Sequence, residues 1–348
     1  MKRSTFRSIG VVVLVIAVAV QTSVLAAQAS GPRVTTLVIQ PARLDTGKDY
    51  SLLPKPEDLT EGNAVPLYDQ AVEKMPTNMN SGQIAEWTRV PLSELPLDQV
   101  QDLLQRAQPS LEAIAQATRR KSCNWPAFQP GTMPAHLSEY RQLTFILCVK
   151  IRSEIAQRKY DEALTTMQTG MAMARQVGDA PTLVQGLVGI AMAAMMLRGV
   201  DDLAQAPDSP NLYAALKALP RPFVDVEKPI ATERKALETS TQYSDAVREA
   251  MRQQVEPAYE RTRQLARRLS ADIGARQCLE ALRHYAATHD GWLPAELDDI
   301  SGVELPNDPV TQKPFMYRLD GDKAVLETAA PEGGSPRETM RLEITVAH

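Results

Sequence analysis

Two histidines in the last third of the chain have the side chain that most often binds metal ions. His284 and His289 lie five positions apart near the end of a predicted helix. A helix directs two histidine rings at one metal ion when they are four positions apart, as in H-E-x-x-H. We therefore predict no metal site here. Both are interpreted as helix-end histidines beside the negative pole of the helix dipole.

Six methionines cluster in two adjacent predicted helices, and thioethers are soft ligands for copper or haem iron. No histidine accompanies them at helical spacing, and Cys148 belongs to a neighbouring helix. Because methionine adapts to irregular space, we expect these side chains to fill a core or to line an adaptable peptide-binding groove, with no cofactor. The six are Met167, Met171, Met173, Met192, Met195 and Met196.

A pair of neighbouring carboxylates is a pattern that can serve acid–base catalysis. Glu233 and Glu238 have this residue type, but they are mixed with Arg234 and Lys235 on a polar helix face. A catalytic carboxylate needs a desolvated setting that shifts its pKa, so we predict no catalytic role for the pair. The segment Asp320-Gly321-Asp322 falls far short of an EF-hand ligand set, and its composition predicts a hairpin turn.

The three cysteines are Cys123, Cys148 and Cys278. In an oxidising compartment one pair could form a disulfide and leave one free thiol, and the sequence leaves this open. Cys148 follows an apolar run and Cys278 lies in a predicted helix, so we expect both to be small buried side chains. The chain contains no C-x-x-C, G-x-S-x-G, S-x-x-K or Walker motif. We predict no catalytic, cofactor-binding or metal-binding residue.

The N-terminus has the pattern of a secretory signal peptide. Three basic residues precede an apolar stretch, Val11–Val20, which is shorter than a membrane span, and Ala27-Gln28-Ala29 fits a cleavage site. We predict a cleaved signal peptide over residues 1–29 and a periplasmic or extracellular protein. A retained anchor is the alternative. We expect no later segment to be long and apolar enough to span a membrane.

The mature chain is predicted to be acidic. Residues 1–29 contain three of the 38 basic residues and none of the 42 acidic ones, which leaves 35 against 42 and a net charge of −7. Nucleic-acid-binding proteins need a clustered basic face, so we expect no nucleic-acid partner. The local run Arg261, Arg263, Arg267 and Arg268 is interpreted as a solvated helix face.

The elements that position these residues are mostly helices. Aromatic residues make up only 5% of the chain, and unbranched side chains that favour helices are abundant. Residues 30–60 are predicted to be an extended arm or linker, and residues 61–256 a helical domain. Within this domain we expect helices over residues 63–75, 97–119, 136–157, 160–177, 181–200 and 211–219. We also expect a loop at 77–94, part of which packs down at Trp87, and a kink or a division of the helix at Pro109.

Two resemblances concern this helical region. The turn Tyr160-Asp161-Glu162-Ala163-Leu164 resembles the helix–helix corner of a tetratricopeptide repeat, where Tyr and Ala allow antiparallel helices to pack closely. No second copy follows 34 residues later, so we expect one repeat-like hairpin and no solenoid. Residues 181–226, preceded by a loop like Cys123-Asn124-Trp125, resemble a group of exported bacterial proteins of unknown function. This resemblance implies a helical fold and an envelope setting.

Residues 257–348 are predicted to form a small α+β domain. Two long helices divided at Pro257 are expected over residues 230–288, and the second carries an apolar stripe at helical spacing. Residues 315–320 and 340–346 alternate between apolar and polar side chains, which is typical of strands with one buried face. We therefore predict a long helix packed on a small antiparallel sheet.

The order of features in residues 275–328 resembles the soluble head of the type II secretion major pseudopilin. A helix is followed by the break Gly291-Trp292-Leu293-Pro294, an Asn-Asp-Pro turn and a strand pair. The resemblance implies one helix on an antiparallel sheet. The chain departs from the family in its ordinary secretory signal, which lies over 200 residues upstream. It also lacks the acidic ligands of the family's calcium loop in Pro331–Pro336, so calcium binding is not expected.

Together these observations predict a mainly α protein, with a helical-hairpin domain followed by the α+β domain. We expect it to be exported, and to act without catalysis through contacts with protein partners in the cell envelope. Two alternatives stay open: an accessory component of a secretion or pilus-like system, and a hydrolase whose site is assembled from residues scattered along the chain.

Overall fold

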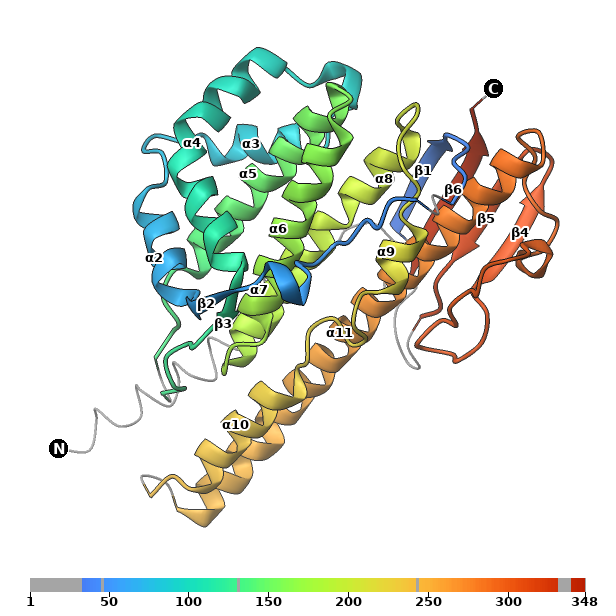
Figure 1. The fold of residues 1–348 in the computed structure, drawn as a ribbon. Helices are drawn as coiled ribbons and strands as arrows, with labels where there is room; N and C mark the ends of the chain where they lie inside the picture. Colours follow the sequence, from blue (N-terminus) through green and yellow to red (C-terminus); the bar gives the residue numbers. More distant parts are fainter. Residues whose placement is uncertain (1–32, 45–46, 130–131, 242–243, 331–338, 348) are drawn as a thin grey trace.

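The structure is a computed structural model that describes residues 33–44, 47–129, 132–241, 244–330 and 339–347. It has a helical body, a long helical hairpin that projects from this body, and a four-stranded sheet (Figure 1). It is thus mainly α with a sheet built largely from C-terminal strands. The predicted signal peptide, the segment Pro331–Pro336 and His348 lie outside the described residues.

Amphipathic helices form the body, and their apolar faces meet in one buried cluster. A short parallel strand pair, β2 (Thr60–Asn63) with β3 (Arg120–Ser122), lies at one end. The helices are α2 (Val65–Glu73), α3 (Ser81–Trp87), α4 (Leu97–Thr118), α5 (Leu137–Ala156), α6 (Tyr160–Gly178), α7 (Leu183–Met196), α8 (Arg198–Gln205) and α9 (Tyr213–Lys217), with 3-10 turns η1 (Pro56–Asp58) and η2 (Leu92–Glu94).

Three predictions for the body are corrected. Helix α3 interrupts the predicted loop at 77–94, because Trp87 packs into the core with 8% of its surface exposed. The helix predicted over 181–200 is divided into α7 and α8 around Leu197. Pro109 does not divide α4. Pro109 and Gln105, the residue whose carbonyl loses its helical donor, are both exposed, so water can satisfy that carbonyl.

The turn predicted between α5 and α6 is confirmed. Helix α5 ends at a left-handed residue, Arg158, with φ 58°. The Arg158 N–H donates to Ile155 O at 2.9 Å and the Lys159 N–H donates to Glu154 O at 2.8 Å. These two bonds form the Schellman motif of a helix C-terminus. Ala163 in the first turn of α6 is fully buried, so the two helices pack closely after the turn.

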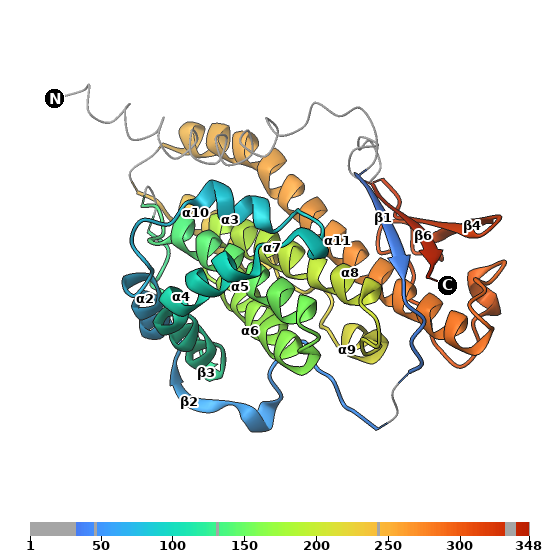
Figure 2. The ribbon, with the colours of Figure 1, turned by 90° about the horizontal axis from the view of Figure 1, so that it is seen from above.

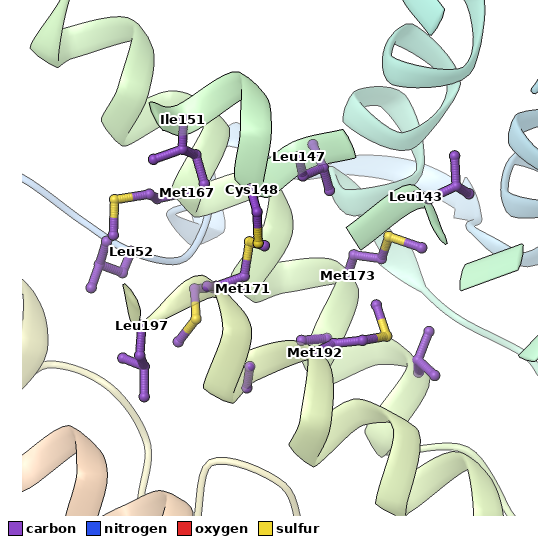
Figure 3. Close-up of a cluster of buried hydrophobic side chains, with 14 of the residues drawn as sticks. Leu52, Leu143, Leu147, Cys148, Ile151, Met167, Met171, Met173, Met192 and Leu197 are labelled. Atoms are coloured by element: carbon purple, nitrogen blue, oxygen red, sulfur yellow. The ribbon is translucent and has the colours of Figure 1, made fainter. Parts of the chain in front are cut away.

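The methionines of α6 and α7 pack in the core beside Cys148 (Figure 3). The two helices approach so closely that a Cβ on Gly189 would lie 2.4 Å from the Cα of Gly178. A flexible thioether suits the irregular space beside such a contact, and core filling is one of the two roles predicted. The most buried are Met167, Met171, Met173, Met192 and Met196, each at most 1% exposed.

The projecting hairpin consists of α10 (Glu227–Glu238) and the 44-residue α11 (Asp245–Thr288) (Figures 1 and 2). Helix α11 runs through Pro257 without interruption, so the predicted division there is wrong. As in α4, the proline and the residue four positions earlier, Gln253, are both exposed to water. The predicted boundary between residues 256 and 257 therefore falls inside one helix.

The sheet has the order β1-β6-β5-β4. Strands β4 (Met316–Asp320), β5 (Lys323–Glu327) and β6 (Met340–Val346) are antiparallel, and β1 (Arg33–Ile39) is parallel to β6. The predicted turn at Gly321 joins β4 to β5 with φ 65°. Before β4 the chain forms the 3-10 turn η3 (Leu297–Asp299). Leu279 and Leu282 of α11 are buried against the inner face of this sheet, which confirms the predicted helix-on-sheet packing. The predicted antiparallel sheet is mixed, because β1 is parallel to β6.

Strand β1 corrects the prediction of an extended arm over residues 30–60. Leu37 and Ile39 are at most 1% exposed and belong to the same buried cluster as α11. Helix α8 covers the outer edge of the strand: Gln40 N–H donates to Ala204 O at 2.8 Å, and Val38 N–H donates to Gln205 Oε1 at 3.3 Å. The N-terminal strand is thus an edge strand of a sheet whose other strands come from the C-terminal region.

One helical stretch, Leu183–Gln205, is long and apolar enough to cross a membrane by length and composition. This finding corrects the expectation that no such segment follows the predicted signal peptide. In the fold the stretch comprises α7 and α8, and 61% of its most apolar window is buried inside the protein. A position inside the helical body also explains this apolar composition, because a helix enclosed by other helices needs apolar residues on most of its surface.

Candidate functional site

An open groove of about 820 Å³ lies where three segments of the chain meet. Its walls come from the segment that follows β1, from the turn between α5 and α6, and from the loop that precedes α9. Its charged lining residues are Arg43, Lys48, Arg158, Lys159, Asp161, Glu162 and Asp208. Both signs of charge are therefore presented in one concave surface.

Ion pairs connect the walls of the groove at the surface. Arg158 Nη1 lies 3.3 Å from Asp208 Oδ2, and both side chains are more than half exposed. Lys48 Nζ lies 3.7 Å from Asp161 Oδ1. In addition, the Tyr160 hydroxyl donates to Pro207 O at 2.5 Å. Exposed pairs of this kind contribute only about 0–1 kcal/mol each, so they can exchange for charges on a partner.

Beneath the groove lies an ion pair with no solvent exposure. Arg283 and Glu280 of α11 are both 0% exposed, with Nη1 and Oε2 2.9 Å apart. The Arg283 guanidinium also donates to the carbonyls of Gln40, Ser209 and Pro210, which belong to or adjoin the groove walls. Glu280 Oε2 in turn accepts the Leu212 N–H at 2.8 Å. Burial raises the pKa of Glu280, and the neighbouring guanidinium opposes this rise.

A second set of buried charges fastens α8 to its neighbours. Asp201 accepts from Arg276 of α11 at 2.7 Å, and Asp202 accepts from Arg152 of α5 at 3.1 Å. Burial raises the pKa of Asp202 to about 6, while Arg152 opposes the rise. Among the described residues, Asp201 Oδ1 is the buried side-chain atom without a hydrogen-bond partner. A cavity of about 10 Å³ beside Arg152 and Asp202 has room for about one water molecule.

The two histidines do not converge. His284 is partly buried, and its Nδ1 accepts the Leu44 N–H at 3.2 Å. Burial lowers the pKa of His284. The exposed His289 ring stacks on Tyr285, with ring centroids 3.7 Å apart. Among the described residues no cluster of three or more His, Cys, Asp or Glu side chains is arranged to hold a metal ion.

The glutamates considered for acid–base chemistry also lie apart from the groove. Glu233 of α10 accepts the Leu183 N–H at 2.8 Å and so caps the start of α7. Burial raises the pKa of Glu233, so this carboxylate is desolvated and the expectation of a solvated polar face is wrong for it. Within the basic run of α11, Arg263 pairs with Glu227 of α10 at 2.7 Å and Arg267 with Glu260 at 3.5 Å. These side chains connect helices or lie along their surfaces.

The three cysteines are free thiols in separate places. Cys148 lies in the core of the body and Cys278 between α11 and the sheet, as small buried side chains. Cys123 is half-buried, in the loop whose Trp125 stacks on Tyr68 with centroids 6.0 Å apart. Burial raises the pKa of each thiol to about 12, so all three stay protonated at neutral pH.

The charges of α11 were not singled out from the sequence. Asp272, Arg276, Glu280 and Arg283 are spaced by four, four and three positions, so they share one face of the helix. Each is at most 5% exposed. The sequence feature that could have indicated their burial is that these opposite charges lie next to the apolar stripe of the helix, which faces the core and not the solvent.

No protein-family model, no curated protein and no solved structure matches this chain.

Proposed function

We propose that this chain is an exported, non-catalytic protein that acts through protein–protein contacts in the cell envelope, with the groove as one contact site. The observation that carries the proposal is the arrangement of charges around the groove. Deeply buried Arg283 and Glu280 hold its backbone, whereas the charges that line it are exposed and pair across its walls.

This arrangement suits recognition of an extended protein segment that carries charges of both signs. A partner's acidic and basic side chains can replace the weak exposed pairs at little cost. The floor, fixed by Arg283, does not have to be ordered on binding, which reduces the entropic cost of association. A catalytic acid or base would instead need a desolvated position, whereas the charges that pair across this groove are exposed.

Cross-linked purification of the tagged mature protein from intact cells tests the proposal. We expect one envelope protein to be enriched with the wild-type chain and lost with the double variant R158E/K159E in the groove. The matched control is K235E, an exposed charge reversal on α10. Equal recovery with all three chains, or turnover of a substrate by the purified protein that a point mutation abolishes, contradicts the proposal.

A more specific role is as an accessory component of a secretion or pilus-like system. The order of α11 followed by the antiparallel strands β4, β5 and β6 favours it, because this is the arrangement that the pseudopilin resemblance implies. A strain that lacks the protein is then expected to secrete less of the cargo of that system. Normal secretion by that strain would exclude this role and leave the groove proposal intact.

A further inference from the structure

His284 of α11 is joined to the wall of the groove by a hydrogen bond that depends on its protonation state. Its Nδ1 accepts the N–H of Leu44, a residue that lines the groove, at 3.2 Å. A backbone N–H can only donate, so Nδ1 must offer a lone pair and the proton of the neutral ring must lie on Nε2. A ring that is protonated at both nitrogens cannot accept this bond.

The part of the wall that precedes Leu44 begins with Ala42, which is attached by bonds that do not titrate. The Ala42 N–H donates to Arg283 O at 3.1 Å, and Ala42 O accepts from Asn211 Nδ2 at 3.0 Å. Backbone amides and the asparagine side chain keep their protons over the ordinary pH range. Ala42 is therefore held in place whether His284 is neutral or charged.

The next two residues of the wall, Arg43 and Leu44, are held by fewer bonds. The Arg43 Nε–H donates to Ala287 O over a long, exposed contact of 3.4 Å. The Leu44 side chain is partly buried against the cluster between α11 and the sheet. Of the bonds described for these two residues, the one from the Leu44 N–H to His284 is shorter and less exposed. It is thus the polar contact that holds this part of the wall on α11.

The surroundings of His284 oppose the protonation of its ring. Partial burial lowers its pKa below the ordinary value of 6.5, and the charges of Arg43 and of a protonated His289 lower it further. The ring is therefore neutral at pH 7, and acid is needed to charge it. The other charged side chains around this wall are Lys159 and Glu162 and three pairs, Lys48 with Asp161, Arg158 with Asp208, and Arg283 with Glu280.

We propose that His284 is a pH switch for this wall of the groove. At neutral pH the uncharged ring holds Leu44 on α11. In acid the protonated ring loses this bond and repels the Arg43 guanidinium, so both residues of the wall detach while Ala42 stays in place. The groove then changes its shape and gains one positive charge. The effect on partner binding rests on the proposed function, whereas the switch itself is a property of the fold.

The free energy of unfolding carries the same pH dependence. A histidine in the unfolded chain becomes charged near pH 6.5, whereas folded His284 becomes charged only at lower pH. Between these values the unfolded state binds more protons than the folded state. The stabilising contribution of His284 is therefore fully present above pH 6.5 and is lost as the pH falls through the pKa of the folded state.

Solution NMR of the mature protein, with isotope-labelled histidine rings and leucine amides, tests the switch between about pH 7.5 and about pH 4.5. The two signals are assigned by their absence from H284N and L44V. We expect the His284 ring and the Leu44 amide to titrate with one shared midpoint below pH 6.5. Protection of this amide from hydrogen exchange, corrected for the intrinsic rate at each pH, is expected to fall by about five- to tenfold, which is the effect of losing one hydrogen bond.

His284→Asn is the variant that keeps the wall attached. The asparagine Oδ1 takes the place of Nδ1 and accepts the Leu44 N–H at every pH, so we expect this amide to stay protected in acid. The matched control is H289N, because His289 is an exposed histidine on the same helix that stacks on Tyr285. This control is expected to keep the acid-induced loss of protection. Arg43→Ala is expected to raise the midpoint, since it removes a charge that opposes protonation.

Three results would overturn the switch. They are a Leu44 amide whose protection does not change with pH, a loss of protection that persists in H284N, and a His284 ring that titrates at a different midpoint from the amide. The wild-type chain alone decides the first and the third, so the test does not depend on the folding of a variant. None of them involves a partner, so the switch and the proposed function can fail separately. If both hold, recovery of the envelope partner falls in acid for the wild-type chain and not for H284N.

Discussion

Glu280 and Arg283 carry opposite charges at positions that water does not reach. The desolvation of two buried ions is offset only when their geometry is good and further hydrogen bonds satisfy them. Here the guanidinium makes bonds to three backbone carbonyls as well as to Glu280. At the residue scale the pair therefore determines where the segments at residues 40–42 and 209–212 lie, and so it shapes the groove.

Arg283→Met is expected to lower the free energy of unfolding by about 3–5 kcal/mol, because Glu280 stays buried without its counter-charge. Urea unfolding measures this loss. The double variant E280Q/R283M is expected to lose less than the sum of the two single variants, since the two side chains act as a unit. Arg267→Ala, exposed on the same helix, is the control with a change within about 0.5 kcal/mol. Additive losses would contradict the account of a coupled pair.

The raised pKa of Asp202 predicts a pH dependence of stability. A free aspartate loses its proton near pH 3.8, whereas Asp202 in the fold holds it to about pH 6. Between these values the folded state binds a proton that the unfolded state has released. The stabilising contribution of Asp202 to the free energy of unfolding is therefore fully present below pH 3.8 and is lost as the pH rises through 6. This loss of unfolding free energy amounts to at most about 3 kcal/mol.

Urea unfolding between pH 4 and pH 7.5 is the measurement. The wild-type chain is expected to lose this contribution across the window, and D202N is expected to lack the corresponding slope while D208N, an exposed control, keeps it. An unchanged slope in D202N would show that Asp202 does not titrate in this range.

Individual site residues could be predicted from the sequence only in part. The five-residue spacing predicted that the rings of His284 and His289 do not face one point, and in the fold the two rings have different partners. The burial of Arg276 and Arg283 could not be predicted, because their partners Asp201 and Ser209 are about 75 residues away in sequence. A charged residue on a helix is usually solvated, and only the tertiary packing of α8 and of the α9 loop makes these an exception.

At the scale of elements, β1 has the largest effect on the architecture. Its parallel pairing with β6 joins the first described residues to the last ones. Local patterns predicted β4 and β6, because their alternation continues over whole strands. Strand β5, with three consecutive buried residues, was expected only as the partner of β4 across the Asp320-Gly321-Asp322 turn. Local patterns did not predict β1, since only Leu37 and Ile39 of its seven residues are buried and its partner strand lies about 300 residues away.

Leu37→Ala is expected to lower the free energy of unfolding by about 2–4 kcal/mol, because it removes buried methyl groups between the sheet and α11. The matched control is Val38→Ala at the neighbouring, 48% exposed position, with a change below about 1 kcal/mol. Chemical unfolding measures both losses. Equal, small effects at the two positions would mean that residues 33–39 are an arm and not a strand of the sheet.

At the scale of the whole molecule, the buried charges join the parts that the sequence suggested as separate domains. Helix α11 contacts the helical body through α7 and α8 and the sheet through its C-terminal half. Arg276 bonds to α8, and Arg283 bonds to the segment that follows β1. The groove is thus one surface of a connected framework. This framework suits a protein that presents contact surfaces to partners.

Site-specific photo-cross-linking in intact cells tests directly whether the groove contacts a protein partner. A photoreactive residue is placed at Lys159 in the groove and, as the matched control, at Trp292, which is 71% exposed elsewhere on the surface. We expect a covalent adduct with one envelope protein at position 159, absent at position 292 and lost when Arg158→Glu is added. No adduct at position 159, or the same adduct at both positions, would contradict the claim that this groove is where the protein meets its partner.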